Sequence, residues 1–264
     1  MISRKQALTA SFAAALISAS SAYAHTTIQT NSLTASASTL ATSTTYNNVV
    51  IGHGCTDAKG KKWPIKHQSV VFPTVSPVLI EASNPSTPSN LTLADIITST
   101  TGLANIPQLI QNNDVFSSQS EKTDANGNVI GFNGFKGELN TNLHGLIPFR
   151  TGAITFKTGA TASNSQCIQK LVIKIGIADI CKTTFPPKEG TANLWIPNQT
   201  SKFSTPLDGM CPEVNGVPAC GTRLGSPATL TINNGACPTG ETVTVWPSDD
   251  DIDANLPMKG WGKK

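Results

Sequence analysis

The most regular stretch of the sequence is Leu171-Val172-Ile173-Lys174-Ile175-Gly176-Ile177-Ala178. Leucine or isoleucine occupies every second position, and the positions between them hold other residue types. Successive side chains of a β-strand point to opposite faces, so this alternation predicts a strand whose isoleucine face lines the core. The stretch therefore indicates a protein built on β-sheets.

Shorter apolar runs separated by turn residues lie on both sides of this strand. They predict further strands at 46–51, 68–72, 75–80, 115–122, 128–132, 153–157, 192–196, 228–232 and 241–246. Asn126-Gly127 predicts a two-residue hairpin turn, and the Ser/Thr-rich residues 26–45 suit an edge strand and a polar loop. Eight or more short strands favour an all-β fold, a two-sheet β-sandwich.

Helix signals are few. Apolar residues recur at helical spacing within 91–110, behind Ser89 or Asn90 as a capping residue, and predict one or two short helices. The segment 248–264 is polar and lacks the Asp-x-Asp-x-Asp-Gly pattern of a calcium loop, so we expect a solvated tail.

Composition narrows the class of protein. Charged residues make up only 13% of the chain, and the 21 glycines and 17 prolines are typical of a secreted, turn-rich β protein rather than a helical bundle. The formal net charge of +3 includes Arg4 and Lys5, so the rest of the chain is nearly neutral. Binding to nucleic acid or to an anionic membrane surface is therefore not expected.

Residues 1–24 have the features of a secretory signal peptide. A basic start precedes an apolar run from Ala7 to about Ile17, and Ala22-Tyr23-Ala24 is a small-x-small cleavage site. The run is shorter than the ~20 apolar residues that span a bilayer, and no later stretch approaches that length. We expect a mature chain of residues 25–264 that is periplasmic or secreted, forms a single domain and has no transmembrane segment.

Six cysteines follow the leader, and an even number in an exported chain predicts three disulfides. Asn215-Gly216 lies midway between Cys211 and Cys220, so a two-residue turn would place these cysteines opposite each other, within disulfide reach. Cys167 and Cys181 bracket the best strand, which separates them by ~46 Å when extended. That leaves Cys55 to pair with either of these two, and Cys237 with the other.

His25 would become the first residue after cleavage. Its α-amine and its imidazole can then chelate one metal ion, which is half of a histidine brace. The amine loses its proton at a pKa of about 7.7 to 8.0, and nitrogen donors favour Cu(II) over Ca(II) or Mg(II). The alternative is a histidine that is merely tolerated after the cleavage site.

Three further histidines are possible ligands. His53 ends a predicted strand beside Cys55, which would hold it rigidly, so it is the first choice for a second ligand. His67 begins the next strand and is the alternative third ligand, because it could share a rim with His53. His144 has no partner in the sequence. Each could instead be an ordinary surface or hydrogen-bonded histidine.

Three motifs lie within residues 24–80: Ala24-His25-Thr26-Thr27, His53-Gly54-Cys55 and the apolar strand Ser69-Val70-Val71-Phe72-Pro73-Thr74. Through these motifs the segment resembles the YcnI-like family of exported copper-binding domains. The resemblance implies a β-sandwich of the cell envelope that binds copper through its N-terminal histidine, with a carboxylate and a nearby tryptophan in some members. Of these site residues, His25 is the one that matches.

Two departures from the family pattern stand out. The acidic ligand would fall near Asn47 or Asn48, and neither is a carboxylate. No tryptophan aligns, although Trp63 is the nearest in sequence and Trp261 lies in a Gly-Trp pair at the other end of the chain.

Three functions follow from these observations. The leading hypothesis is a periplasmic copper-binding protein, not an enzyme, that holds Cu(II) through His25, His53 and His67 for buffering or for delivery to another copper-handling protein of the envelope. The second is a metal-free structural or surface-associated β-sandwich. The third is a copper monooxygenase acting on polysaccharide, but the mature chain has only one tyrosine and no evident aromatic platform. A hydrolase is disfavoured because the chain lacks Gly-x-Ser-x-Gly.

Overall fold

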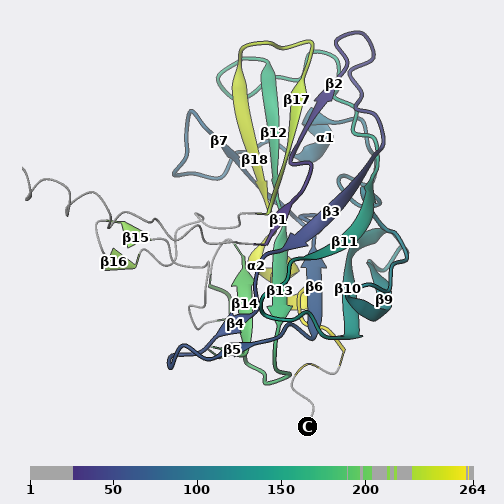
Figure 1. Ribbon diagram of the computed structural model, residues 1–264. Coiled ribbons are helices and arrows are strands. Elements are labelled where there is room, and N and C mark those ends of the chain that lie inside the picture. The colour runs from purple at the N-terminus through teal and green to yellow at the C-terminus, as the bar shows by residue number, and fades with distance from the viewer. Residues whose placement is uncertain are drawn as a thin grey trace, which may run out of the picture.

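The computed structural model describes residues 26–188, 190–196, 199–203, 228–259 and 261, together with the backbone of 213–214 and 217–218. These residues form three larger sheets, two two-stranded ribbons and two short helices (Figure 1). The disulfide-braced, all-β architecture predicted from the sequence is confirmed.

The first sheet has the strand order β1-β3-β11-β8 and is antiparallel throughout. Its strands are β1 (Thr27–Ile28), β3 (Thr45–Ile51), β11 (Gly145–Thr151) and β8 (Pro107–Leu109). The second sheet has the order β14-β13-β6-β10-β9. Its strands are β14 (Ala192–Trp195), β13 (Gly176–Ile180), β6 (His67–Val71), β10 (Val129–Gly137) and β9 (Phe116–Thr123).

The third sheet has the order β2-β17-β12-β18-β7 and contains two parallel pairs. Its strands are β2 (Ser32–Ala35), β17 (Thr229–Asn234), β12 (Ile168–Lys174), β18 (Glu241–Trp246) and β7 (Val78–Glu81). The ribbons are β4 (Cys55–Thr56) with β5 (Lys62–Trp63), and β15 (Glu213–Val214) with β16 (Val217–Pro218). β1 and β2 are edge strands, as expected for the Ser/Thr-rich segment 26–45.

The stretch 171–178 is buried as predicted but serves two sheets. β12 pairs with β17 and β18, whereas β13 pairs with β6 and β14, and only Ile175 separates the two strands. Figure 1 shows β12 in the upper part of the molecule and β13 below it. The described strands therefore form three larger sheets rather than two, because one chain segment passes from one sheet into another.

One main hydrophobic core draws on all three sheets. Representative fully buried members are Val49, Phe149, Val70, Phe132, Ile173 and Val243. The second sheet, called the β13 sheet below, has the main core on one face. A second hydrophobic cluster covers its other face, where Val71 and Ala178 pack with Ile252 and Leu256. The β13 sheet is thus covered on both faces, and this explains why every residue of β13 is buried.

Helix α2 (Asp249–Asn255) covers that opposite face, and it corrects the expectation of a solvated tail from residue 248. The hydroxyl of Ser248 accepts a hydrogen bond from the N–H of Asp251, and acidic residues fill the first turn, where they stabilise the helix dipole. Asp251 is fully buried, and its carboxylate is satisfied by hydrogen bonds from the N–H groups of Thr74 and Val75 and from the side chain of Asn255.

Helix α1 (Leu93–Ile96) is shorter than the sequence suggested and begins after Thr92 rather than Ser89 or Asn90. Thr92 and Asp95 form a capping box. The hairpin of β9 and β10 is confirmed around Asn126-Gly127, but Asp124 and Asn128 close a longer loop than two residues.

The structure pairs Cys55 with Cys181 and Cys167 with Cys237, one of the two combinations that the sequence left open. β15 and β16 pair Val214 with Val217, the register expected for a turn at Asn215-Gly216. Cys211 and Cys220 lie outside the described residues, so their disulfide stays a prediction.

Lys122 places an ammonium group beneath helix α2. Its Nζ donates to the Ser69 hydroxyl at 2.7 Å and to the backbone carbonyl of Asn255. Burial lowers the pKa of Lys122 from its ordinary value of 10.5 to about 7, although the nearby Asp251 carboxylate acts in the opposite direction. The last residue of helix α2, Asn255, is therefore hydrogen-bonded to an amine with a pKa of about 7.

We expect removal of the Cys55–Cys181 bond to lower the free energy of unfolding by about 4 kcal/mol, because a bond between residues 126 apart strongly restricts the unfolded chain. Guanidinium unfolding of the Cys55→Ala/Cys181→Ala variant measures this loss. The Cys167→Ala/Cys237→Ala variant, with a separation of 70, should lose slightly less. Equal free energies for the oxidised wild type and the first variant would contradict the prediction.

We also expect the free energy of unfolding to rise between pH 7 and about 10.5. In this window the unfolded chain keeps the Lys122 proton and the folded chain has lost it, so a rise in pH favours the folded state. Chemical denaturation across this range measures the slope, and the Lys122→Met variant should show a smaller one. An identical slope in both proteins would refute the prediction.

Candidate functional site

A buried carboxylate forms the centre of the candidate site. Asp179 lies on β13 and is fully buried. Its Oδ1 accepts a hydrogen bond from Nε2 of Gln68 at 2.8 Å. Its Oδ2 accepts from the hydroxyl of Thr26 at 2.5 Å and from Nε1 of Trp195 at 2.9 Å. All three donors are neutral, so hydrogen bonds satisfy the carboxylate without neutralising its charge.

The electrostatics of Asp179 favour a nearby positive charge. Burial raises the pKa of Asp179, while its three hydrogen bonds and the neighbouring His53 act in the opposite direction without cancelling the effect. Among the described residues no side chain forms a salt bridge with Asp179. Because a buried charge is costly when unpaired, a cation bound here would stabilise the ionised form.

The side-chain amide of Gln68 has an unsatisfied acceptor next to Asp179. Its Nε2 donates to Asp179, but its Oε1 is buried and has no donor within the described part of the chain. Buried acceptors are nearly always hydrogen-bonded in folded proteins. The cluster of Thr26, Gln68, Asp179 and Trp195 is thus one N–H or O–H donor short.

His53 lies beside this cluster, with its ring 6.4 Å from that of Trp195 in an edge-on arrangement. Its Nδ1 is 2.6 Å from the carbonyl oxygen of Gly54, which can only accept, so Nδ1 carries the proton. Nε2 is then the nitrogen with a lone pair available to a metal ion, an arrangement that proteins use to orient metal-binding histidines.

The backbone that holds His53 is tightly constrained. A Cβ on Gly54 would lie 2.1 Å from the carbonyl oxygen of Trp63, so only glycine fits between His53 and the ribbon formed by β4 and β5. The next residue, Cys55, is bonded to Cys181 at the end of β13. His53 is therefore held next to a disulfide, as its sequence position suggested.

His67 lies on the other face of the sheet. Side chains alternate along β6, and Gln68 points toward Asp179, so its neighbour His67 points away from it. His67 instead lines a cavity together with Ile180 and Trp261. The expected sharing of a rim by His53 and His67 is therefore not found, and one metal ion cannot use both.

The remaining proposed residues are placed as follows. His25 lies outside the described residues. His144 is exposed, just before β11. No three His, Cys, Asp or Glu side chains gather in a metal-binding arrangement within the described ranges. The described residues thus supply the imidazole of His53 and the negative charge of Asp179 to this site.

The residues considered for the family's carboxylate and tryptophan have other roles here. Asn47 braces the first sheet through hydrogen bonds with the backbone of Thr30. Trp63 donates to Asp57 and lies under the ammonium groups of Lys61 and Lys182. The sequence patterns did not predict Asp179 and Trp195 as site residues. A charged residue inside the apolar strand Gly176–Ile180 was the available signal.

Comparison of this chain with protein families, curated proteins and solved structures finds no match. The resemblance to the YcnI-like family therefore rests on the quoted residues alone, and no family is assigned. Neither helix in the described part of the chain is long and apolar enough to cross a membrane.

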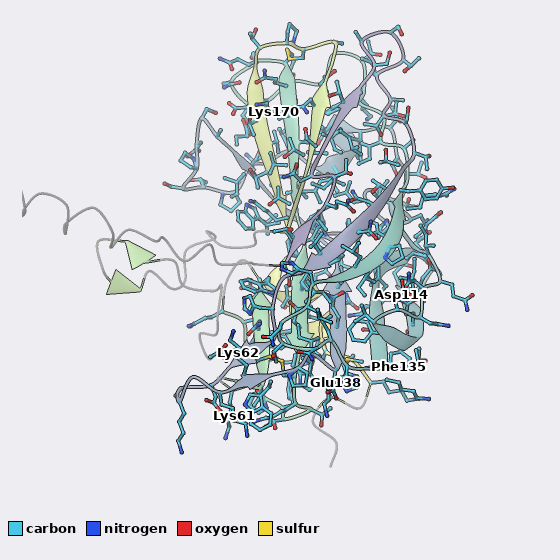
Figure 2. All side chains as sticks on the ribbon, viewed as in Figure 1. Lys61, Lys62, Asp114, Phe135, Glu138 and Lys170 are labelled. Carbon is cyan, nitrogen blue, oxygen red and sulfur yellow. A yellow bond between two sulfur atoms is a disulfide. The ribbon has the colours of Figure 1, made fainter. Side chains whose placement is uncertain are left out.

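We expect the Asp179→Ala variant to lose about 3 kcal/mol of stability, because Thr26, Gln68 and Trp195 would each lose the buried carboxylate to which they donate. Urea unfolding measures the loss. Asp114→Ala is the matched control, since Asp114 is exposed at the surface (Figure 2) and should change stability by no more than about 0.5 kcal/mol. Similar losses in both variants would show that Asp179 has no special structural role.

Proposed function

We propose that this protein is an exported copper-binding protein that holds Cu(II) at its processed amino terminus, next to the cluster of Thr26, Gln68, Asp179 and Trp195. The observation that carries the proposal is the hydrogen bond from the Thr26 hydroxyl to Asp179. Thr26 directly follows the expected first residue of the mature chain, His25.

Covalent geometry limits where the terminus can begin. Consecutive Cα atoms are about 3.8 Å apart, so residue 25 starts one residue from a side chain that is fixed to Asp179. Cleavage after Ala24 would create an amine at that position. Such an amine would supply both a metal-binding nitrogen and an N–H donor of the kind that Gln68 Oε1 lacks.

The donor set suits copper. The amine and imidazole of His25 would chelate the ion, and Nε2 of His53 is the third nitrogen. Nitrogen ligands of this kind favour Cu(II), which leads the divalent series in affinity. Both oxygens of Asp179 already accept hydrogen bonds, so Asp179 acts through its negative charge rather than as a direct ligand.

Export agrees with the covalent structure. The leader 1–24 has the features of a signal peptide, and two disulfides are present. Disulfides persist in the periplasm and outside the cell. In that compartment a Cu(II) site on a small β-sandwich would serve to buffer the metal or to deliver it to another copper-handling protein of the envelope.

A metal-free structural β-sandwich is the second candidate. It is favoured by the full set of hydrogen bonds to Asp179, which could hold the cluster without any ion. The two candidates differ in what the amino terminus does, so the terminus is the part to test.

We expect protein processed to a free His25 to bind one Cu(II), and the same protein with one extra alanine before His25 to bind at least about tenfold more weakly, because the chelating amine has moved. Titration with competing chelators measures affinity, and electron paramagnetic resonance reports nitrogen ligation. His53→Ala should also weaken binding, whereas His67→Ala should not, because His67 lies on the other face of the sheet.

Equal copper affinity of the native and extended proteins would remove the terminal site. Equal affinity of the wild type and the His53→Ala variant would remove the third ligand. Circular dichroism of each variant checks that the fold is retained.

A further inference from the structure

A cavity of about 410 Å³ lies on the face of the β13 sheet opposite Asp179. Its apolar walls come from several elements: Phe135 of β10, Ile180 of β13, and Met258 and Trp261 after helix α2. Phe135 is labelled near the lower end of the molecule in Figure 2. This volume and lining are typical of a site for a small organic molecule.

The aromatic wall is fixed in place. Nε1 of Trp261 donates to the carbonyl oxygen of Thr184 at 3.1 Å. The indole also packs against Phe185 and Phe203, with ring centroids 5.3 Å and 5.7 Å away. A flat ring entering the cavity would therefore meet a preorganised aromatic surface, which lowers the entropic cost of binding.

Two buried polar atoms in the cavity wall lack partners. They are Nδ1 of His67 and Oδ1 of Asn133, each without a hydrogen bond to the described residues. Asn133 pairs with Ser69, so His67 lies two residues further along β6 on the same face. Burial, together with Lys66, lowers the pKa of His67 and favours its neutral form. A hydroxyl group has one proton, which it can donate to Oδ1 of Asn133, while its oxygen accepts the N–H of His67 in the tautomer that carries the proton on Nδ1, so one hydroxyl satisfies both atoms.

The lining also includes Ser120, Thr183 and two lysines, Lys136 and Lys259, and neither lysine forms a salt bridge with a described residue. Phe135 and Lys136 both line the cavity although neighbouring residues of a strand point to opposite faces. The backbone of Lys136 has a φ of 57°, a conformation rare for residues other than glycine, and this interrupts the alternation. Lys136 therefore adds a second positively charged side chain beside Lys259 at this cavity, which favours an anionic ligand.

We propose that this cavity binds a small phenolic carboxylate, an aromatic ring that carries a hydroxyl group and a carboxylate. The ring packs against Trp261 and Phe135, the hydroxyl pairs with Asn133 and His67, and the carboxylate faces Lys136 and Lys259. The proposal is independent of copper, since the Asp179 cluster lies on the other face of the sheet.

The test uses 4-hydroxycinnamate as the probe, titrated into the full mature protein by calorimetry and by tryptophan fluorescence. Cinnamate, which lacks the hydroxyl, should bind about tenfold more weakly, as expected for an unmade hydrogen bond to a buried acceptor. The Asn133→Leu variant should abolish the preference for the hydroxylated probe. Lys259→Gln should weaken both acids but not 4-hydroxycinnamyl alcohol.

Controls separate this site from the rest of the protein. Lys170→Gln changes a lysine at the opposite end of the molecule (Figure 2) and should leave affinity unchanged. His53→Ala removes the proposed third copper ligand and should also leave the affinity for 4-hydroxycinnamate unchanged. No binding of 4-hydroxycinnamate at millimolar concentration would overturn the proposal, as would equal binding by the wild type and the Asn133→Leu variant. Octanoate binding tighter than either aromatic acid would overturn the aromatic assignment.

Discussion

The structure depends on one chain segment that serves two sheets and is held at both ends. Cys167 immediately precedes β12 and is bonded to Cys237, while Cys181 immediately follows β13 and is bonded to Cys55. Between these bonds the chain leaves one sheet and enters the next at Ile175. A Cβ on Gly176 would lie 2.6 Å from Cδ1 of Ile252, so glycine at this point lets helix α2 pack closely. The main core, the second core and the candidate site all lie along this segment, because each needs β13 in a fixed position.

Periodicity predicted most of the strands because hydrophobic alternation is a local signal. It could not predict the change of sheet at Ile175, since the alternation continues through that residue and only the pairing partners change. The strand at 145–151 escaped notice because it contains Pro148, which has no N–H to donate and usually argues against a central strand. Helix α2 escaped notice because its aspartates were interpreted as a solvated tail, although Ser248 followed by three acidic residues is a helix start signal.

The site was predictable only where sequence neighbours act together. His53 and Cys55 are two residues apart, so a rigid histidine beside a disulfide could be expected. The separation of His53 from His67 depends on which face of β6 points to Asp179, and a one-residue change of register would reverse it. Asp179 was missed because apolar neighbours dominate its strand, and its donors come from residues 26, 68 and 195, which are brought together only by folding.

Adjacent residues of β13 face the two proposed sites: Asp179 points toward the proposed copper site and Ile180 toward the cavity. Coupling between a metal ion and a cavity ligand would therefore require this strand to move. β13 is hydrogen-bonded to β6 on one side and β14 on the other, is buried on both faces, and ends at a disulfide. These contacts all hold β13 in one position, and coupling requires an element with two arrangements. We therefore expect the two sites to act independently, so that each can be tested without interference from the other.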